Sequence, residues 1–76
     1  MPTVLRFRGF NFFFFSHEGN EPAHIHVKKG DGAAKFWLDP VKLVYNDGFK
    51  KQEVRAIISI LEKHEVELIR AWNEIE

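Results

Sequence analysis

Residues 23–39 constrain the fold of this 76-residue chain more than any other segment, because apolar and polar residues alternate on both sides of a short turn. Alternation with a period of two is typical of half-buried β-strands. The turn contains Asp31-Gly32, a favoured two-residue loop in β-hairpins. With this dipeptide as the loop, His24 pairs with Asp39. The segment is therefore predicted to form an antiparallel hairpin of fixed register.

The two strands of this hairpin agree on which face is apolar, because directly opposed residues share a face. The apolar face consists of Ile25, Val27, Ala34, Phe36 and Leu38. The polar face consists of His24, His26, Lys28, Lys35, Trp37 and Asp39. A register shifted by one residue would scatter this second group, so any function assigned to it depends on the register.

Three further segments have the pattern of strands. Residues 3–8 alternate, and Gly9-Phe10-Asn11 supplies a turn. Residues 12–16 begin with four phenylalanines and are apolar on both faces, which suits the middle of a sheet or a partner interface. Residues 41–45 alternate again and predict either a fifth strand or a packed extended segment.

From about Lys51 the apolar residues recur at spacings of three and four, which is typical of an amphipathic helix. We expect either one helix of about 24 residues or two nearly continuous helices with a break near residues 63–65. A single straight helix would extend beyond the sheet. Its end, with Trp72 and Ile75, would then be either core or a partner surface.

These elements predict an α+β fold in one domain spanning residues 1–76. A small antiparallel sheet of four to five strands carries one long, or two nearly continuous, C-terminal helices packed on one face. The other face of the sheet is left uncovered.

Composition narrows the setting. The chain has no cysteine, which excludes disulfides and cysteine-based zinc sites and suits a reducing cytoplasm. No apolar run approaches the roughly 20 residues of a membrane span, and the N-terminus lacks a signal-peptide pattern. We therefore expect a small cytoplasmic protein with no membrane partner. The formal net charge is zero, so no overall basic field attracts nucleic acid.

Four runs of residues carry a resemblance to a known family. They are Met1-Pro2-Thr3-Val4-Leu5-Arg6, Glu18-Gly19-Asn20-Glu21-Pro22-Ala23-His24-Ile25-His26-Val27, Ala34-Lys35-Phe36-Trp37-Leu38 and Leu68-Ile69-Arg70-Ala71-Trp72. Together they resemble the small bacterial domain of unknown function family 4160, over nearly the whole chain. Members are often encoded beside another small protein, in an arrangement similar to a toxin–antitoxin pair. The resemblance implies a cytoplasmic bacterial protein with a small partner protein encoded nearby.

The start of the helix departs from the family pattern. Relatives tend to have serine where Lys50 stands, which gives a capping box with Glu53. A lysine side chain cannot accept that hydrogen bond. We expect the helix start to shift or to use Asp47 instead.

The pair His24-x-His26 is the sharpest chemical feature. Two histidines at positions i and i+2 of a strand point to one side and can converge on a metal ion or a phosphate. A tight zinc site needs at least three protein ligands, so Asp39 opposite His24 would complete a divalent-metal site. His17, Glu18 or Glu21 would be substitutes. The alternative is that both imidazoles hydrogen-bond the backbone of the preceding loop and hold it in place.

Lys28, Lys35 and Trp37 lie beside the histidines on the predicted polar face. Two cations and a flat ring can neutralise phosphate and stack a base. In small ribonuclease toxins a basic group stabilises the phosphate while histidine or lysine moves protons. The candidate catalytic residues are therefore His24, His26 and Lys35.

Two arginines, Arg6 and Arg8, would extend the Lys28, Lys35 and Trp37 surface if the first strand neighbours the hairpin. The alternative is an ordinary solvated face on which Trp37 lies against lysine stems.

The leading hypothesis is one component of a toxin–antitoxin-like two-gene module, which engages RNA or a protein partner through the His/Lys/Trp face. Whether it is an enzyme stays open. The alternative is a non-catalytic module that binds a divalent metal ion or a protein through His24 and His26. A second copy of the chain is a further candidate partner.

Overall fold

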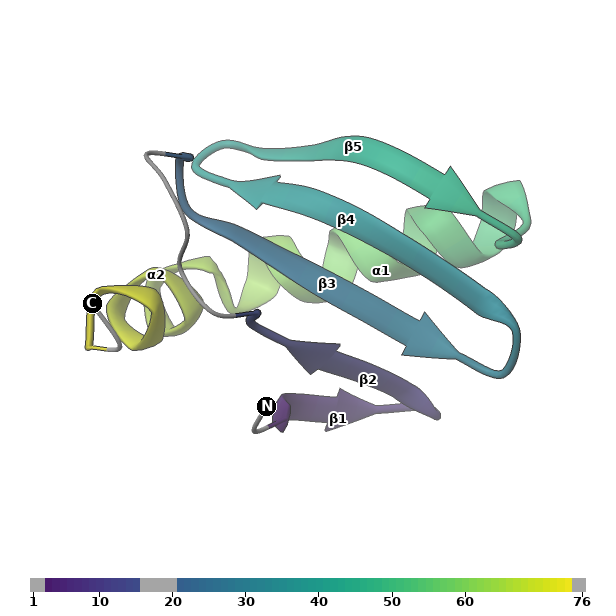
Figure 1. Cartoon of the computed structure of the whole chain (residues 1–76), viewed down its shortest axis with the longest axis horizontal. Helices are drawn as coiled ribbons and strands as arrows, with labels where there is room; N and C mark the ends of the chain where they lie inside the picture. Colours follow the sequence, from purple (N-terminus) through teal and green to yellow (C-terminus); the bar gives the residue numbers. More distant parts are fainter. Residues whose placement is uncertain (1–2, 16–20, 75–76) are drawn as a thin grey trace.

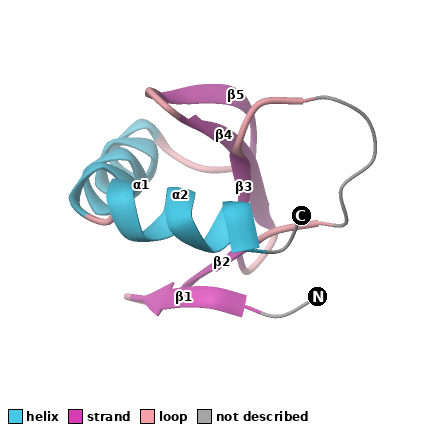
Figure 2. Cartoon of the chain, turned by 90° about the vertical axis from the view of Figure 1, so that its left-hand side faces the viewer, coloured by secondary structure: helices cyan, strands magenta, loops and turns pink. Residues whose placement is uncertain are grey.

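A computed structural model describes residues 3–15 and 21–74 of the chain. Within these residues, five strands are followed by two helices. They are β1 (Thr3–Phe7), β2 (Phe10–Phe13), β3 (His24–Lys29), β4 (Gly32–Leu38), β5 (Val41–Asp47), α1 (Lys51–Lys63) and α2 (Glu65–Glu74). The strands form one antiparallel sheet in the order β1-β2-β3-β4-β5, and both helices lie on one side of it (Figures 1 and 2). The predicted α+β fold is confirmed, and residues 41–45 belong to a fifth strand.

The first hairpin turns one residue earlier than its sequence suggested. Phe7 pairs with Phe10, so the loop is Arg8-Gly9, and both loop residues have positive φ, at 53° and 84°. Two consecutive residues with positive φ are typical of a type I′ turn. The predicted turn at Gly9-Phe10-Asn11 was therefore wrong. The sequence did not suggest the true turn, because its first position is taken by an arginine and not by the glycine or asparagine that usually adopts a positive φ.

The second hairpin joins β3 to β4 through Gly30-Asp31, and the predicted loop Asp31-Gly32 was wrong. Gly30 has a φ of 57°, whereas Asp31 keeps a negative φ, as in a type II′ turn. Gly32 lies in β4, where a Cβ atom would come within 2.6 Å of the Phe49 ring. This glycine is therefore explained by close packing rather than by the turn.

This change shifts the register of the β3–β4 pair by two residues. His24 pairs with Trp37, not with Asp39, and His26 pairs with Lys35. A shift of two preserves the alternation of side chains, so every residue within the two strands stays on its predicted face.

The core lies between the sheet and the helices. It consists of Phe10, Phe12, Phe14, Ile25, Val27, Ala34, Phe36, Leu38, Phe49, Ile57, Ile60, Leu61, Leu68 and Trp72. Alternation divides the phenylalanine run between the two faces. Phe12 and Phe14 are 0% and 2% exposed, whereas the Phe15 side chain is 48% exposed. The predicted strand is confirmed only at Phe12 and Phe13, because β2 ends there. Phe14 and Phe15 follow it without strand structure, and Ser16 lies outside the described residues.

The helical region breaks at His64, as the second of the two predicted alternatives required. The His64 N–H donates to the carbonyls of Ile60 and Leu61 at 3.1 and 3.2 Å, which ends α1. In Figure 1, α1 runs along the sheet and α2 is seen almost end-on, so the chain turns sharply between them. Trp72 of α2 is 5% exposed and packs on Phe14, with ring centroids 5.5 Å apart.

Trp72 is therefore core. Ile75, for which the same question was open, lies outside the described residues. No helix in the part of the chain that the structure describes is both long and apolar enough to cross a lipid bilayer.

The start of α1 relies on Glu53 and Asn46 rather than on Asp47. Glu53 accepts a hydrogen bond from the Lys50 N–H at 2.9 Å, so half of a capping box is present. Asn46 bonds both backbone groups of Phe49, accepting from its N–H at 3.0 Å and donating to its carbonyl at 2.9 Å. The expected role of Asp47 was wrong, because the Asn46 amide can both donate and accept.

Candidate functional site

The sheet face opposite the helices, called the open face below, carries most of the predicted site residues. Its side chains are Arg6, Asn11, Phe13, Phe15, His24, His26, Lys28, Ala33, Lys35, Trp37, Lys42, Tyr45 and Asp47. One cross-strand row of direct pairs runs Phe13–His26–Lys35–Tyr45, from β2 to β5. Since paired residues share a face, this row brings two aromatic rings, an imidazole and a cation together.

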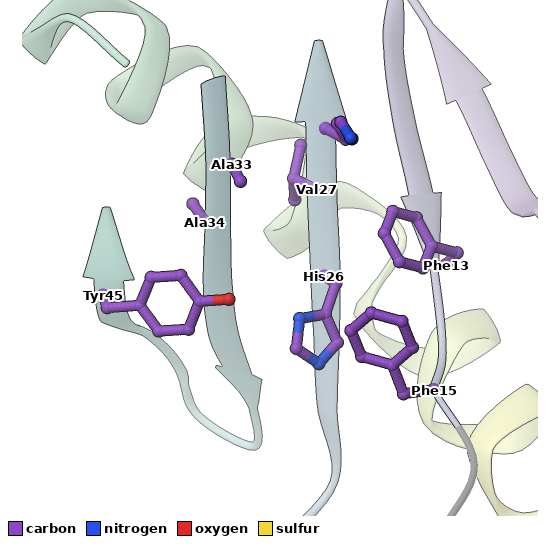
Figure 3. Close-up of a pocket in the computed structure, with 8 residues that line it drawn as sticks. Phe13, Phe15, His26, Val27, Ala33, Ala34 and Tyr45 are labelled. Carbon is purple, nitrogen blue, oxygen red and sulfur yellow. The ribbon is translucent and has the colours of Figure 1, made fainter. Parts of the chain in front are cut away.

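The open face is hollowed near the middle of this row. The hollow has a volume of about 340 Å³ and is lined by Phe13, Phe15, His26, Val27, Lys28, Ala33, Ala34 and Tyr45. Figure 3 shows the two phenylalanines on one side of His26 and the tyrosine on the other. We call this space the aromatic hollow. Its volume is at the lower end of the range of about 300–1,000 Å³ for small-ligand pockets, and its rings suit a flat group.

His26 is held within the aromatic hollow by ring contacts. Its imidazole stacks on Phe13 with centroids 5.8 Å apart, and the Phe15 ring meets it edge-on at 4.2 Å. Burial, and to a smaller extent the nearby charges of His24 and Lys35, lower the pKa of His26 to about 4, against the opposing effect of Glu21. His26 is therefore neutral at pH 7, and its ring can stack and form hydrogen bonds without charge.

Lys35 lies beside His26 and is tied to a carboxylate. Its Nζ donates to Oε1 of Glu21 at 2.6 Å, and the same Nζ lies 5.0 Å from the centre of the Trp37 ring. The hydrogen bond and charge of Lys35 hold the pKa of Glu21 below its usual value. This ion pair places one cation and one anion at the border of the aromatic hollow.

His24 is mostly a structural residue. Its Nδ1–H donates to the Pro22 carbonyl at 2.9 Å, and its buried ring packs on Trp72 and Trp37 at 4.7 and 6.0 Å. For His24, the alternative in which the imidazole bonds the preceding loop is confirmed. The catalytic role proposed for it stays a prediction.

The structure does not place Asp39, the predicted third metal ligand, next to His24. Asp39 is exposed in the turn between β4 and β5, because Trp37 takes the position opposite His24. Among the residues that the structure describes, no three histidine, aspartate or glutamate side chains gather as a metal-ligating group. His17 and Glu18, the substitutes named from the sequence, lie outside those residues.

The two arginines separate. Arg6 Nε donates to Oδ1 of Asn11 at 3.0 Å, and Asn11 pairs with Lys28, so Arg6 joins the open face across β2. Arg8 lies in the β1–β2 turn with its guanidinium 5.4 Å from the centre of the Phe7 ring. It lines a groove against α1, on the helix side of the sheet. Arg8 therefore does not extend the predicted surface.

Comparison with known protein families gives a match. The family described as "Domain of unknown function (DUF4160)" matches residues 9–73. The chain belongs to this family. Comparison with curated proteins and with solved structures gave no significant match. The resemblance seen in the sequence is thus confirmed over nearly the whole chain.

In this family member, sequence reasoning missed the aromatic hollow. Phe13 and Phe15 could have been assigned to the open face from the alternation of the phenylalanine run. Tyr45 could not have been assigned in this way, because a β-bulge in β5 moves its side chain to the other face of the sheet. Lys35 pairs with Tyr45 but the next residue, Phe36, pairs with Leu43, so the extra residue turns Tyr45 toward the open face.

Proposed function

We propose that this protein binds single-stranded RNA on the open face of its sheet, as one component of a toxin–antitoxin-like two-gene module. The observation that carries the proposal is the aromatic hollow, which lies on an uncovered sheet beside lysine side chains. Sheets that present aromatic rings between cations stack unpaired bases in several RNA-binding modules. A base stacked on Phe15 would lie against a ring that is already 48% exposed.

Local charge supports the proposal despite the zero net charge of the chain. The cations of the open face are Arg6, Lys28, Lys35 and Lys42. Binding that neutralises about two or three phosphates would give a logarithmic salt slope of about −1.5 to −2 for a single strand. RNA binding at this site is therefore expected to depend more on stacking than on salt-sensitive attraction.

A protein partner on the same face is less well supported. Aromatic rings are enriched at protein interfaces too, but lysine is depleted there. Here Lys28 lines the aromatic hollow and Lys35 borders it. Lysines in these places favour a phosphate-bearing ligand over an apolar protein surface.

The setting forms part of the proposal. A small partner protein encoded nearby and a cytoplasmic location follow from the family resemblance, and the lack of cysteine is compatible with a reducing compartment. The proposal concerns binding and assigns no reaction to His26 or Lys35.

Fluorescence anisotropy with a labelled single-stranded oligoribonucleotide of mixed sequence tests the proposal. Phe15→Ala should weaken binding about 5- to 100-fold, since stacking on one aromatic side chain contributes about 1–3 kcal/mol. The matched control is Phe7→Ala, because Phe7 is 41% exposed but lies on the helix side. It should bind as the wild type does. An absence of RNA binding, or equal losses in both variants, would overturn the proposal.

A further inference from the structure

Glu21 occupies a distinctive place at the border of the aromatic hollow. Its carboxylate accepts a hydrogen bond from Lys35 at 2.6 Å, and Lys35 pairs directly with His26 in the sheet. The Lys35 side chain is only 15% exposed, whereas that of Glu21 is 49% exposed. The ammonium group of Lys35, which is largely buried, is thus covered by the solvent-exposed carboxylate of Glu21.

We propose that the Glu21 carboxylate occupies the phosphate subsite of the open face, and that a phosphate group of the bound nucleic acid displaces it from Lys35. This inference rests on the proposed RNA binding. It assigns Lys35 as the phosphate ligand and Glu21 as an internal competitor for it.

The position of Lys35 supports this assignment. It pairs directly with His26, which lines the aromatic hollow, and paired residues in an antiparallel sheet lie about 4.5–5.5 Å apart. A base in the hollow therefore brings its own backbone phosphate within reach of the ammonium group. The Trp37 ring, 5.0 Å from Nζ, helps to hold that group in place.

Exchange of the Glu21 carboxylate for a phosphate group on Lys35 replaces one anionic hydrogen-bond acceptor by another. Carboxylate and phosphate oxygens both accept charge-assisted hydrogen bonds from an ammonium group. Because Glu21 is exposed, its ion pair with Lys35 belongs to the weak class of surface salt bridges. A phosphate that is held nearby by base stacking can replace it, whereas a free anion must compete at its bulk concentration.

A double-mutant cycle with the same oligoribonucleotide tests the inference. Glu21→Gln should tighten binding about three- to five-fold, because the competitor no longer carries charge. Lys35→Gln should weaken binding, and Glu21→Gln should add nothing in that background. The matched control is Asp47→Asn, which removes an exposed open-face carboxylate that pairs with Ala33 rather than contacting Lys35. It should change affinity less than two-fold, as expected for a general charge effect.

Equal effects of Glu21→Gln and Asp47→Asn would overturn the subsite, as would a Glu21→Gln gain that persists without Lys35. If Phe15→Ala weakens RNA binding as expected, this outcome would leave the proposed function intact.

A second measurement tests whether Lys35 binds phosphate in competition with Glu21, even if no variant binds RNA. Inorganic pyrophosphate is titrated while the NMR signals of Lys35 and His26 are followed. Shifts should be clear in the Glu21→Gln variant, weaker in the wild type and absent in Lys35→Gln. Identical responses in all three proteins would overturn the subsite.

Discussion

The two faces of the sheet use aromatic rings in opposite ways. On the covered face, Phe12 and Phe36 are 0% exposed beneath the helices. On the open face, Phe15 and Tyr45 are 48% and 46% exposed. Neighbouring residues of one phenylalanine run serve both faces, so aromatic content alone does not separate a core from a binding surface. The difference lies in what surrounds the rings, which is other buried apolar side chains on the covered face and lysines with an imidazole on the open face.

This contrast predicts that the faces contribute unequally to stability. Phe36→Ala should lower the free energy of unfolding by about 3–5 kcal/mol, because it removes a fully buried ring and leaves a cavity. Phe15→Ala should cost less than about 1 kcal/mol, because nearly half of that side chain is already in water. Urea denaturation followed by tryptophan fluorescence measures both. Similar losses in the two variants would mean that the open face is part of the core.

The division into two faces could be predicted from sequence for a physical reason. Alternation along 23–39 determines the side of each residue, and a register error of two leaves the sides unchanged. The same error changes every partner, and it placed Asp39 beside His24. Choosing the loop Gly30-Asp31 over Asp31-Gly32 required the Phe49 ring, which packs against Gly32 from a distant part of the chain. Local turn preference cannot report such a contact.

The site was less predictable than the fold. The bulge that brings Tyr45 to the open face leaves no mark in the alternation of residues 41–45. The ion pair of Glu21 with Lys35 joins residues 14 positions apart, and Glu21 lies before the alternating segment, where no strand pattern predicts the position of its side chain. The sequence did place His26, Lys35 and Trp37 on one face, because these lie on regular strands. The parts that it missed depend on tertiary packing.

Acid should distinguish the open face from an ordinary solvated surface. The folded pKa of His26, about 4, lies below its usual value of 6.5, so the unfolded chain binds a proton that the folded chain does not. The stability that results is present above pH 6.5 and is lost as pH falls toward 4. The full shift corresponds to about 3 kcal/mol. Solvent access to the open face reduces the expected loss to about 1–2 kcal/mol.

Urea denaturation at pH 7 and pH 5 measures most of this loss and avoids the lower range in which Glu21 titrates. The control is His26→Gln, which should reduce the difference between the two pH values. An equal difference in wild type and variant would assign the acid sensitivity to other groups and leave His26 as a solvated residue.

The smallest expected effect concerns the turn beside the covered face. Arg8 has a φ of 53°, in the left-handed region that asparagine adopts more easily than other side chains. Arg8→Asn should raise the free energy of unfolding by about 0.5–1 kcal/mol, whereas Arg8→Gln removes the same charge without relieving the backbone.

Because Arg8 lies on the helix side, neither variant should change RNA affinity, while Arg6→Gln on the open face should weaken it. If Arg8→Asn weakens RNA binding as much as Arg6→Gln does, the ligand reaches both sides of β1 and the two faces are not functionally separate.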